Sequence, residues 1–361
     1  MSNKGKIVSI QALRALAFLG IFLSHAGAPN FKWPALGVSI FYVLSGYLMF
    51  LQYGDSEINC SVKENIQFSW GKIKKLYPLH IITMCFAIVL QIIIRIHNGL
   101  SLKGIIYLIG CTGLNVTLLQ TWIPYSSINV SLNGVAWYLS VTMFLYFVFP
   151  FIKNWIKNKK NSFLTLFCVA MLIFEIIICI PFIIILGADS PIYIWFMYCF
   201  PIFRVGDFLI GCCLCKRNIE TVRNDNASFG KYSIYEIGAT LCTVTVFIWM
   251  KQEIANPLLL ATHNWTTLYI PLAATWITLF VEKKGCITML LTNRVTIFIG
   301  NISAYTFLIH YVITQYFGSA ISFLHLELSY LENVIKIIIE LIITIIVTLV
   351  YMKITKKKIE F

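Results

Sequence analysis

The sequence predicts an all-α, polytopic integral membrane protein, and three observations support this fold class. Of the 361 residues, 59% are hydrophobic and only 12% are charged, whereas soluble domains carry about 25% charged residues. The mean hydropathy is +0.81. The apolar residues form runs of roughly 20, the length of a helix that crosses a bilayer core. We expect one membrane domain over residues 1–361, a bundle of about ten transmembrane helices plus one partial or re-entrant element, without a separate soluble domain.

Eleven apolar runs are candidates for the membrane helices. They cover residues 7–28, 36–53, 76–97, 104–122, 134–152, 162–187, 193–215, 233–250, 265–281, 295–317 and 333–353. The fourth run is interrupted by Gly110, Gly113 and Asn115. Irregular backbone at membrane depth is tolerated only where protein or water covers it. We therefore expect the run 104–122 to re-enter the membrane or to lie in a cavity, while the other ten runs span it.

The basic residues predict the orientation of the chain. Lys4 and Lys6 at one end and the lysine-rich tail 353–358 at the other both favour the cytoplasmic side. With both termini cytoplasmic the number of crossings is even, and ten crossings place 21 of the 28 Lys and Arg residues in cytoplasmic loops. We expect a multi-pass protein of the cell (plasma or inner) membrane. Nucleic acid is excluded as a partner, because the basic residues form no stripe with interleaved aromatic residues.

The cysteines and the N-terminus raise two further alternatives. Most of the eleven cysteines lie inside apolar runs and are expected to be free thiols. The cluster Cys212, Cys213 and Cys215 has no His or acidic partner at ligand spacing, so we expect no metal site. The short run 15–23 with the "AGA" at 26–28 imitates a cleavable signal peptide. A membrane span is favoured because the apolar run resumes further upstream.

Arg14 and His25 stand inside the first apolar run. They are eleven residues apart, so at ~100° per residue they lie within about 20° of each other on one helix face, separated by ~16 Å along the axis. Charged residues at membrane depth are costly and usually functional. A lone Arg14 can also snorkel to the headgroups, and a lone His25 can be an interfacial residue. The shared face, with Gln11 and Ser24 nearby, favours a functional pair.

Other ionisable residues lie in later runs. Arg204 and Asp207 have the i,i+3 spacing of an ion pair on one helix, and structural pairing is the favoured interpretation for Asp207. His310 has no such partner in its own run, so we expect its partner elsewhere in the bundle. Glu175 and Glu340 are further candidates among plain lipid-like neighbours.

Five stretches resemble, in order and spacing, the motifs of the acyltransferase-3 family, membrane enzymes that O-acylate glycans and other hydroxyl compounds. They are "RALAFLGIFLSH" (14–25), "GVSIFYVLSGYLM" (37–49), "WGKIKKLYPLH" (70–80), "PIFRVGDFLIG" (201–211) and "ISAYTFLIHYVI" (302–313). The sequence also departs from the family pattern. The acidic residue of the fifth run is absent, with Thr142 and Met143 in its neighbourhood, and Val312 stands where a proline is usual. The family's arginine pair in the basic loop is Lys72 and Lys75 here.

The resemblance implies an O-acyltransferase that moves an acyl group, acetyl being the commonest choice, from cytoplasmic acyl-CoA to a hydroxyl of a cell-surface or exported glycan, with no metal. It implies that Arg14, Lys72 and Lys75 grip the anionic donor. Histidine has an ordinary pKa of about 6.5, and His25 is the expected general base. Arg14 is expected to be a catalytic residue together with His25. The expected partners are membrane lipid, acyl-CoA and the hydroxyl acceptor, and a homo-oligomer is left open.

Four more residues are expected in the pocket. Trp137, Arg204 and His310 are assigned there without a chemical step. Ser45 either hydrogen-bonds within the site or only allows close helix packing beside Gly46.

The competing function is a transporter or flippase for a glycan or a lipid-linked glycan, which ten spans with buried Arg and His residues would also suit. The sequence shows no internal repeat of the kind that marks many secondary transporters, which favours the enzyme. A scaffold within a polysaccharide-synthesis complex is the third alternative, and for it Arg14 and His25 would be dispensable. The sequence names neither the acceptor nor the acyl group.

Overall fold

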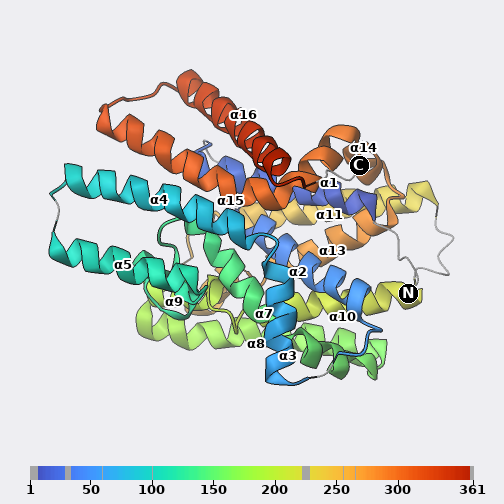
Figure 1. The fold of residues 1–361 in the computed structure, drawn as a ribbon. Coiled ribbons are helices and arrows are strands. Elements are labelled where there is room, and N and C mark those ends of the chain that lie inside the picture. The colour runs from blue at the N-terminus through green and yellow to red at the C-terminus, as the bar shows by residue number, and fades with distance from the viewer. Residues whose placement is uncertain are drawn as a thin grey trace.

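The chain folds into a bundle of helices (Figure 1), described by a computed structural model for residues 7–28, 34–58, 60–99, 101–221, 228–254, 256–264 and 266–357. The described part contains no β-strand. Eight of its helices are long and apolar enough to cross a membrane. They are α1 (Val8–His25), α2 (Pro34–Tyr53), α4 (Tyr77–His97), α7 (Trp137–Lys157), α8 (Asn161–Leu186), α11 (Phe229–Trp249), α15 (Arg294–Phe323) and α16 (Tyr330–Ile354). The predicted polytopic all-α class is confirmed.

Shorter elements complete the described part of the bundle. The longer of them are α3 (Val62–Ile73), α5 (Leu102–Val116), α9 (Pro191–Tyr198), α10 (Val205–Thr221) and α13 (Tyr269–Glu282). The pieces of six residues or fewer are α6 (Ser126–Asn129), α12 (Pro257–Leu260), α14 (Cys286–Leu291), η1 (Gln120–Trp122), η2 (Gly134–Ala136) and η4 (Ala261–His263). Two of the expected spans, 193–215 and 265–281, therefore do not form long single helices.

The run 193–215 is divided between α9 and α10. Pro201 lies in the turn between them. Proline has no amide hydrogen to donate and disfavours helical backbone at the residue before it, so the helix ends and restarts. Arg204, which is fully buried, closes this turn just before α10 begins. The bundle thus contains a broken helix with an ionisable side chain at the break.

The run 104–122 also forms no full span, as the sequence predicts. The 15 residues of α5 reach about 22 Å, less than a bilayer core of ~30 Å. The irregular backbone that follows is buried and hydrogen-bonded by protein groups: the Ser140 hydroxyl donates to the Leu118 carbonyl over 2.5 Å, and the Trp195 ring nitrogen to the Thr121 carbonyl over 2.8 Å. Protein therefore satisfies the polar groups that lipid could not.

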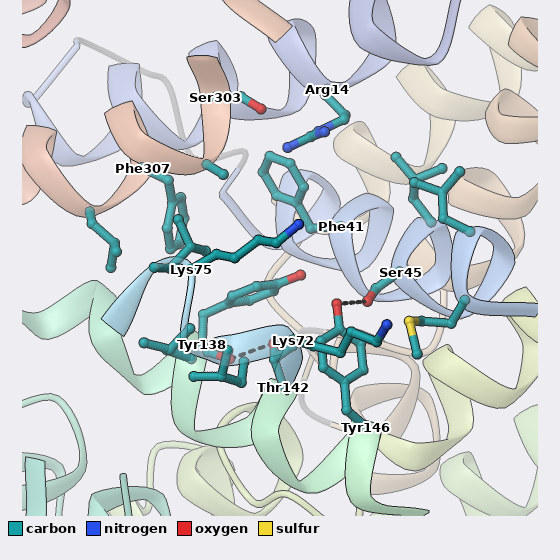
Figure 2. A pocket seen from close by; sticks show the side chains of 18 of the residues that line it. Arg14, Phe41, Ser45, Lys72, Lys75, Tyr138, Thr142, Tyr146, Ser303 and Phe307 are labelled. Carbon is teal, nitrogen blue, oxygen red and sulfur yellow. Dashed lines mark hydrogen bonds between the residues drawn. The ribbon is translucent and has the colours of Figure 1, made fainter. Parts of the chain in front are cut away.

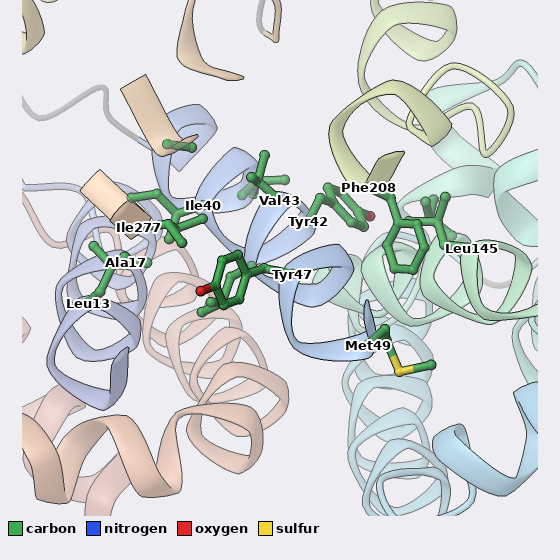
Figure 3. Packing of buried hydrophobic residues seen from close by; sticks show 14 of the residues in the cluster. Leu13, Ala17, Ile40, Tyr42, Val43, Tyr47, Met49, Leu145, Phe208 and Ile277 are labelled. Carbon is green, nitrogen blue, oxygen red and sulfur yellow. The ribbon is translucent and has the colours of Figure 1, made fainter. Parts of the chain in front are cut away.

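Helix α2 lies at the centre of the bundle and packs against α1, α10 and α13. Figure 3 shows its apolar side chains fanning out, with Ile40 toward Ile277 and Tyr42 toward the Phe208 side. A methyl group at Gly46 would overlap the carbonyl of Phe208 in α10. Such close backbone approach is how helices gain packing energy in lipid, where no hydrophobic effect drives them together.

Helix α15 packs on both α1 and α16, and the start of α16 lies beside the end of α1. At one end of the pair the Lys336 ammonium donates to the carbonyl of Ala26 over 2.9 Å. At the other end Lys357 donates to the carbonyl of Lys75, in the turn between α3 and α4, over 2.9 Å. Lys357, just after α16, therefore packs against the basic motif 70–80.

Candidate active site

A cavity of about 520 Å³ lies among α1, α2, α3, α7 and α15 (Figure 2). One face carries apolar and aromatic side chains, among them Phe41, Tyr138 and Phe307. The predicted residues Arg14, Ser45, Lys72 and Lys75 also line it. Residues that are separated by up to 61 positions in the sequence therefore meet around one space, although their motifs are distributed over three segments.

Three cations extend into this cavity from two directions. Figure 2 shows Arg14 entering from α1, opposite Lys72 and Lys75. The Arg14 guanidinium donates to the Gln11 side chain over 3.3 Å. No Asp or Glu is found among the described residues that line the cavity. The described lining thus carries positive charge without a carboxylate to neutralise it, which suits an anionic ligand.

Lys72 is held in place by aromatic residues. Its ammonium donates to the Tyr53 hydroxyl, lies 3.7 Å from the centroid of that ring and lies 4.8 Å from the centroid of Phe68. These contacts orient the charge without cancelling it. Ser61 caps α3, because its side chain accepts from the Glu64 amide, and so begins the helix that carries Lys72.

Lys357 is a fourth cation, next to Lys75. The sequence alone does not identify it as a site residue. Its ammonium lies 4.6 Å from the centroid of the Tyr305 ring and donates to the Lys75 backbone. Partial burial and the nearby Lys75 ammonium lower the pKa of Lys357. The only signal in the sequence is the basic tail, which by itself indicates membrane topology.

Hydroxyl groups line the same cavity. The Ser45 and Tyr146 oxygens lie 3.0 Å apart and share a hydrogen bond. Thr142, at the neighbourhood where the family's acidic residue is missing, faces the cavity, and its hydroxyl donates to the Tyr138 carbonyl over 2.7 Å. Of the two roles considered for Ser45, hydrogen bonding describes its contacts. Gly46 beside it is the residue at which the helices approach closely.

His25 and His310 form a pair outside this cavity, at the far end of α1. His25 Nδ1 lies 3.0 Å from His310 Nε2. The two rings are nearly parallel, at 12°, with centroids 5.3 Å apart. His310 is fully buried, whereas His25 is exposed. The partner that the sequence could only place elsewhere in the bundle is therefore His25 itself.

A layer of aromatic rings separates the cavity from this histidine pair. The centroids of Phe41, Tyr138 and Phe307 lie 5.5–6.1 Å from one another. Phe307 also lies 5.8 Å from the His310 ring. The cavity and the exposed imidazole thus lie on opposite sides of these rings.

Trp137 and Arg204 lie behind the cavity lining. Arg204 forms the predicted ion pair with Asp207 and lies over the Tyr42 ring, 4.7 Å from its centroid. Tyr42 stacks on Tyr138 at 4.5 Å, and the Trp137 ring lies 6.1 Å from Tyr42. These residues support the cavity wall through Tyr138. Among the described residues no cluster of three or more His, Cys, Asp or Glu side chains could hold a metal ion.

Comparison with known proteins agrees with the motifs. A family model described as an acyltransferase domain matches residues 7–353. The acyltransferase MdmB of Streptomyces mycarofaciens is 25% identical over 232 residues, which cover 57% of this chain and 56% of that protein. The O-acetyltransferase OatA of Staphylococcus aureus is 24% identical over 216 residues, which cover 57% of this chain and 34% of OatA. The chain therefore matches about half or less of these curated relatives. No solved structure matches.

Proposed function

This chain belongs to the acyltransferase-3 family, and on that premise we propose that it is a membrane O-acyltransferase. In this proposal it takes an acyl group, acetyl in the first instance, from acyl-CoA and transfers it to a hydroxyl of a cell-surface or exported glycan. The observation that carries the proposal is the 520 Å³ cavity lined by Arg14, Lys72 and Lys75, with no carboxylate among its described lining residues. An acyl-CoA combines phosphates, which need cations, with a long arm that fits the less polar wall.

The donor binds with its phosphates at the cations. Lys72 and Lys75 act as point charges, without the two-pronged geometry of arginine. Lys357 adds a third lysine beside them. We assign Arg14, on the opposite wall, to the pantetheine arm and the thioester. The proposal places this end in the cytoplasm, both chain termini with it, and the protein in the cell membrane.

The acceptor meets His25 at the other end of α1. His25 is exposed there, and imidazole is the side chain whose charge changes nearest neutral pH. The acceptor hydroxyl gives its proton to the imidazole as its oxygen attacks the thioester carbonyl carbon. The C–S bond breaks, the electron pair leaves on sulfur, and the thiolate takes a proton from water to leave as CoA thiol. His25 then loses its proton to water, so that protons balance over the cycle.

For this chemistry the acyl end must pass the aromatic layer. The proposal therefore includes movement of the Phe307 ring, which lines the cavity and contacts His310. Ring rotation is a modest displacement compared with a helix movement, and it would join the cavity to the histidine pair.

The test measures free thiol released from acetyl-CoA by the purified protein in lipid nanodiscs, with and without a hydroxyl-rich oligosaccharide. We expect acceptor-dependent thiol release and ester formation that His25→Ala reduces by at least about 100-fold. Ser24→Ala, one residue away, is the matched control and should keep the rate. Full acylation by His25→Ala would refute the assigned base. Transport of a glycan without any acyl donor would favour the transporter.

A further inference from the structure

His310 has no task in the proposed reaction, yet it is the most constrained group near His25. It is fully buried in α15. Aromatic rings surround it: the centroids of Phe18, Phe22 and Phe307 lie 5.7, 6.1 and 5.8 Å from its own. Burying a charge among such rings is costly, so the neutral imidazole is the form that this surrounding favours. A neutral imidazole carries one N–H donor and one acceptor nitrogen.

Both ring nitrogens of His310 have partners, and the partners determine its tautomer. Nδ1 lies 3.2 Å from the carbonyl oxygen of Thr306, one turn earlier in α15. A carbonyl can only accept, so His310 Nδ1 carries the hydrogen. Nε2 of the neutral ring is then a lone pair. It faces His25 Nδ1 at 3.0 Å.

The same logic extends to His25. Because His310 Nε2 accepts, His25 Nδ1 must be the donor of the shared hydrogen bond. The remaining nitrogen of His25, Nε2, is then unprotonated. His25 stands exposed at the end of α1, and no hydrogen bond from a described residue reaches Nε2. The unprotonated nitrogen is thus the one available to an acceptor.

We propose that His310 is a positioning residue, which through the chain Thr306 carbonyl–His310–His25 fixes His25 in the tautomer that a general base needs. Tyr311, whose ring meets His25 edge-on at 5.1 Å, limits rotation of the same imidazole. The proposal rests on the function proposed above and deepens it. When His25 Nε2 takes the acceptor proton, the O–C bond forms and the C–S bond of the donor breaks. The imidazolium keeps its Nδ1 hydrogen bond to His310, so no proton needs to be relayed through the pair.

Without His310 the tautomer would be unconstrained. A His25 ring that carries its hydrogen on Nε2 cannot accept a proton there. In a serine protease, a triad partner that selects the wrong histidine tautomer lowers kcat by about 10⁴. That partner is a buried carboxylate, whereas His310 is neutral and contributes orientation only. We therefore expect a smaller loss, about 10²- to 10³-fold in kcat, with the KM for acetyl-CoA unchanged because the donor cavity is untouched.

Two variants and one control test this role kinetically. His310→Phe keeps a ring and removes both nitrogens, and it should show the full loss in kcat. His310→Gln places an amide oxygen near the position of Nε2, can accept from His25 Nδ1, and should stay within about 10-fold of the wild-type rate. Ser322→Ala, at an exposed position of the same helix α15, is the control and should retain the wild-type rate. Equal rates for His310→Phe and the wild type would overturn the proposal, as would a His310→Gln variant no better than His310→Phe.

A spectroscopic readout does not depend on turnover. Solid-state ¹⁵N NMR of protein labelled at histidine distinguishes protonated from unprotonated ring nitrogens, and the His25→Ala variant assigns the His25 signals. We expect a protonated Nδ1 and an unprotonated Nε2 for His25 in the wild type, and an Nε2-protonated fraction in His310→Phe. A wild-type His25 protonated on Nε2 alone would refute the inference. If His25→Ala keeps full activity, His25 is not the general base of the proposed reaction. If only the His310 predictions fail, the proposed function stands.

Discussion

The cation-lined cavity gives the prediction with the clearest magnitude. Lys72→Met keeps most of the length of the side chain and its contact with the Phe68 and Tyr53 rings, but removes the ammonium that these rings orient. A hydrogen bond that involves a charged group contributes about 1.5–3 kcal/mol. Lys72 is half-buried, so water and salt partly screen its charge, and we take about 1.5 kcal/mol. This corresponds to about a 10-fold rise in the KM for acetyl-CoA.

The assay measures initial rates of thiol release against acetyl-CoA concentration in nanodiscs. Lys74→Met is the matched control, because Lys74 lies in the same turn, is exposed and is not part of the cavity lining. It should leave the KM within about 2-fold, as expected for a screened surface charge. Acetyl-pantetheine, which lacks the nucleotide phosphates, is the second control. With this donor the Lys72→Met and wild-type KM values should be equal.

Two results would contradict donor binding by the cavity lysines. An unchanged KM for acetyl-CoA in both Lys72→Met and Lys75→Met would show that the cavity cations do not bind the donor. An equal rise with acetyl-pantetheine would show that the substitution distorts the cavity and that no phosphate contact is lost. Raised salt should increase the wild-type KM more than the Lys72→Met KM, because the variant has one charge fewer to screen.

Three further changes test other parts of the site. Lys357→Met should raise the KM for acetyl-CoA about 3- to 10-fold, because it removes one of the lysines beside Lys75, and an unchanged KM would exclude it from the donor site. Phe307→Ala opens the aromatic layer and should raise acceptor-independent hydrolysis of acetyl-CoA several-fold, measured as thiol release without acceptor; a decrease would contradict the proposed passage. Gly46→Val should destabilise the bundle by at least 1–3 kcal/mol in thermal unfolding, because the added carbons overlap the Phe208 carbonyl. Ser45→Ala should destabilise it by only about 1 kcal/mol, because it removes one hydrogen bond. Equal stability of Gly46→Val and the wild type would contradict the close approach of the two helices.

Helical periodicity and apolar length accounted for much of the fold in advance. The bounds of α4, α7, α8 and α16 lie close to the apolar runs, because a membrane helix must hide its backbone within its own residues. The break between α9 and α10 was missed, although Pro201 was visible in the sequence. Hydropathy measures only how apolar the side chains are. It therefore does not reveal a turn whose side chains are as apolar as those of the helices beside it.

The site was predictable only where one helix or one motif contains it. Arg14 and His25 could be placed on one face of α1 because eleven residues make three turns. The pairing of His25 with His310, the ring of Phe307 between cavity and histidines, and the approach of Lys357 depend on contacts between helices distant in the sequence. Local spacing contains no information about such contacts, so only the structure assigns them.

The most direct test of the central claim is the content of alkali-labile acyl esters on the surface glycans of cells that carry or lack this gene. We expect deletion to lower the ester content and the wild-type gene to restore it. The His25→Ala gene, expressed at the same level in the membrane, should fail to restore it. Unchanged ester content after deletion, or full restoration by His25→Ala, would contradict the claim that this protein is an O-acyltransferase with His25 as its base.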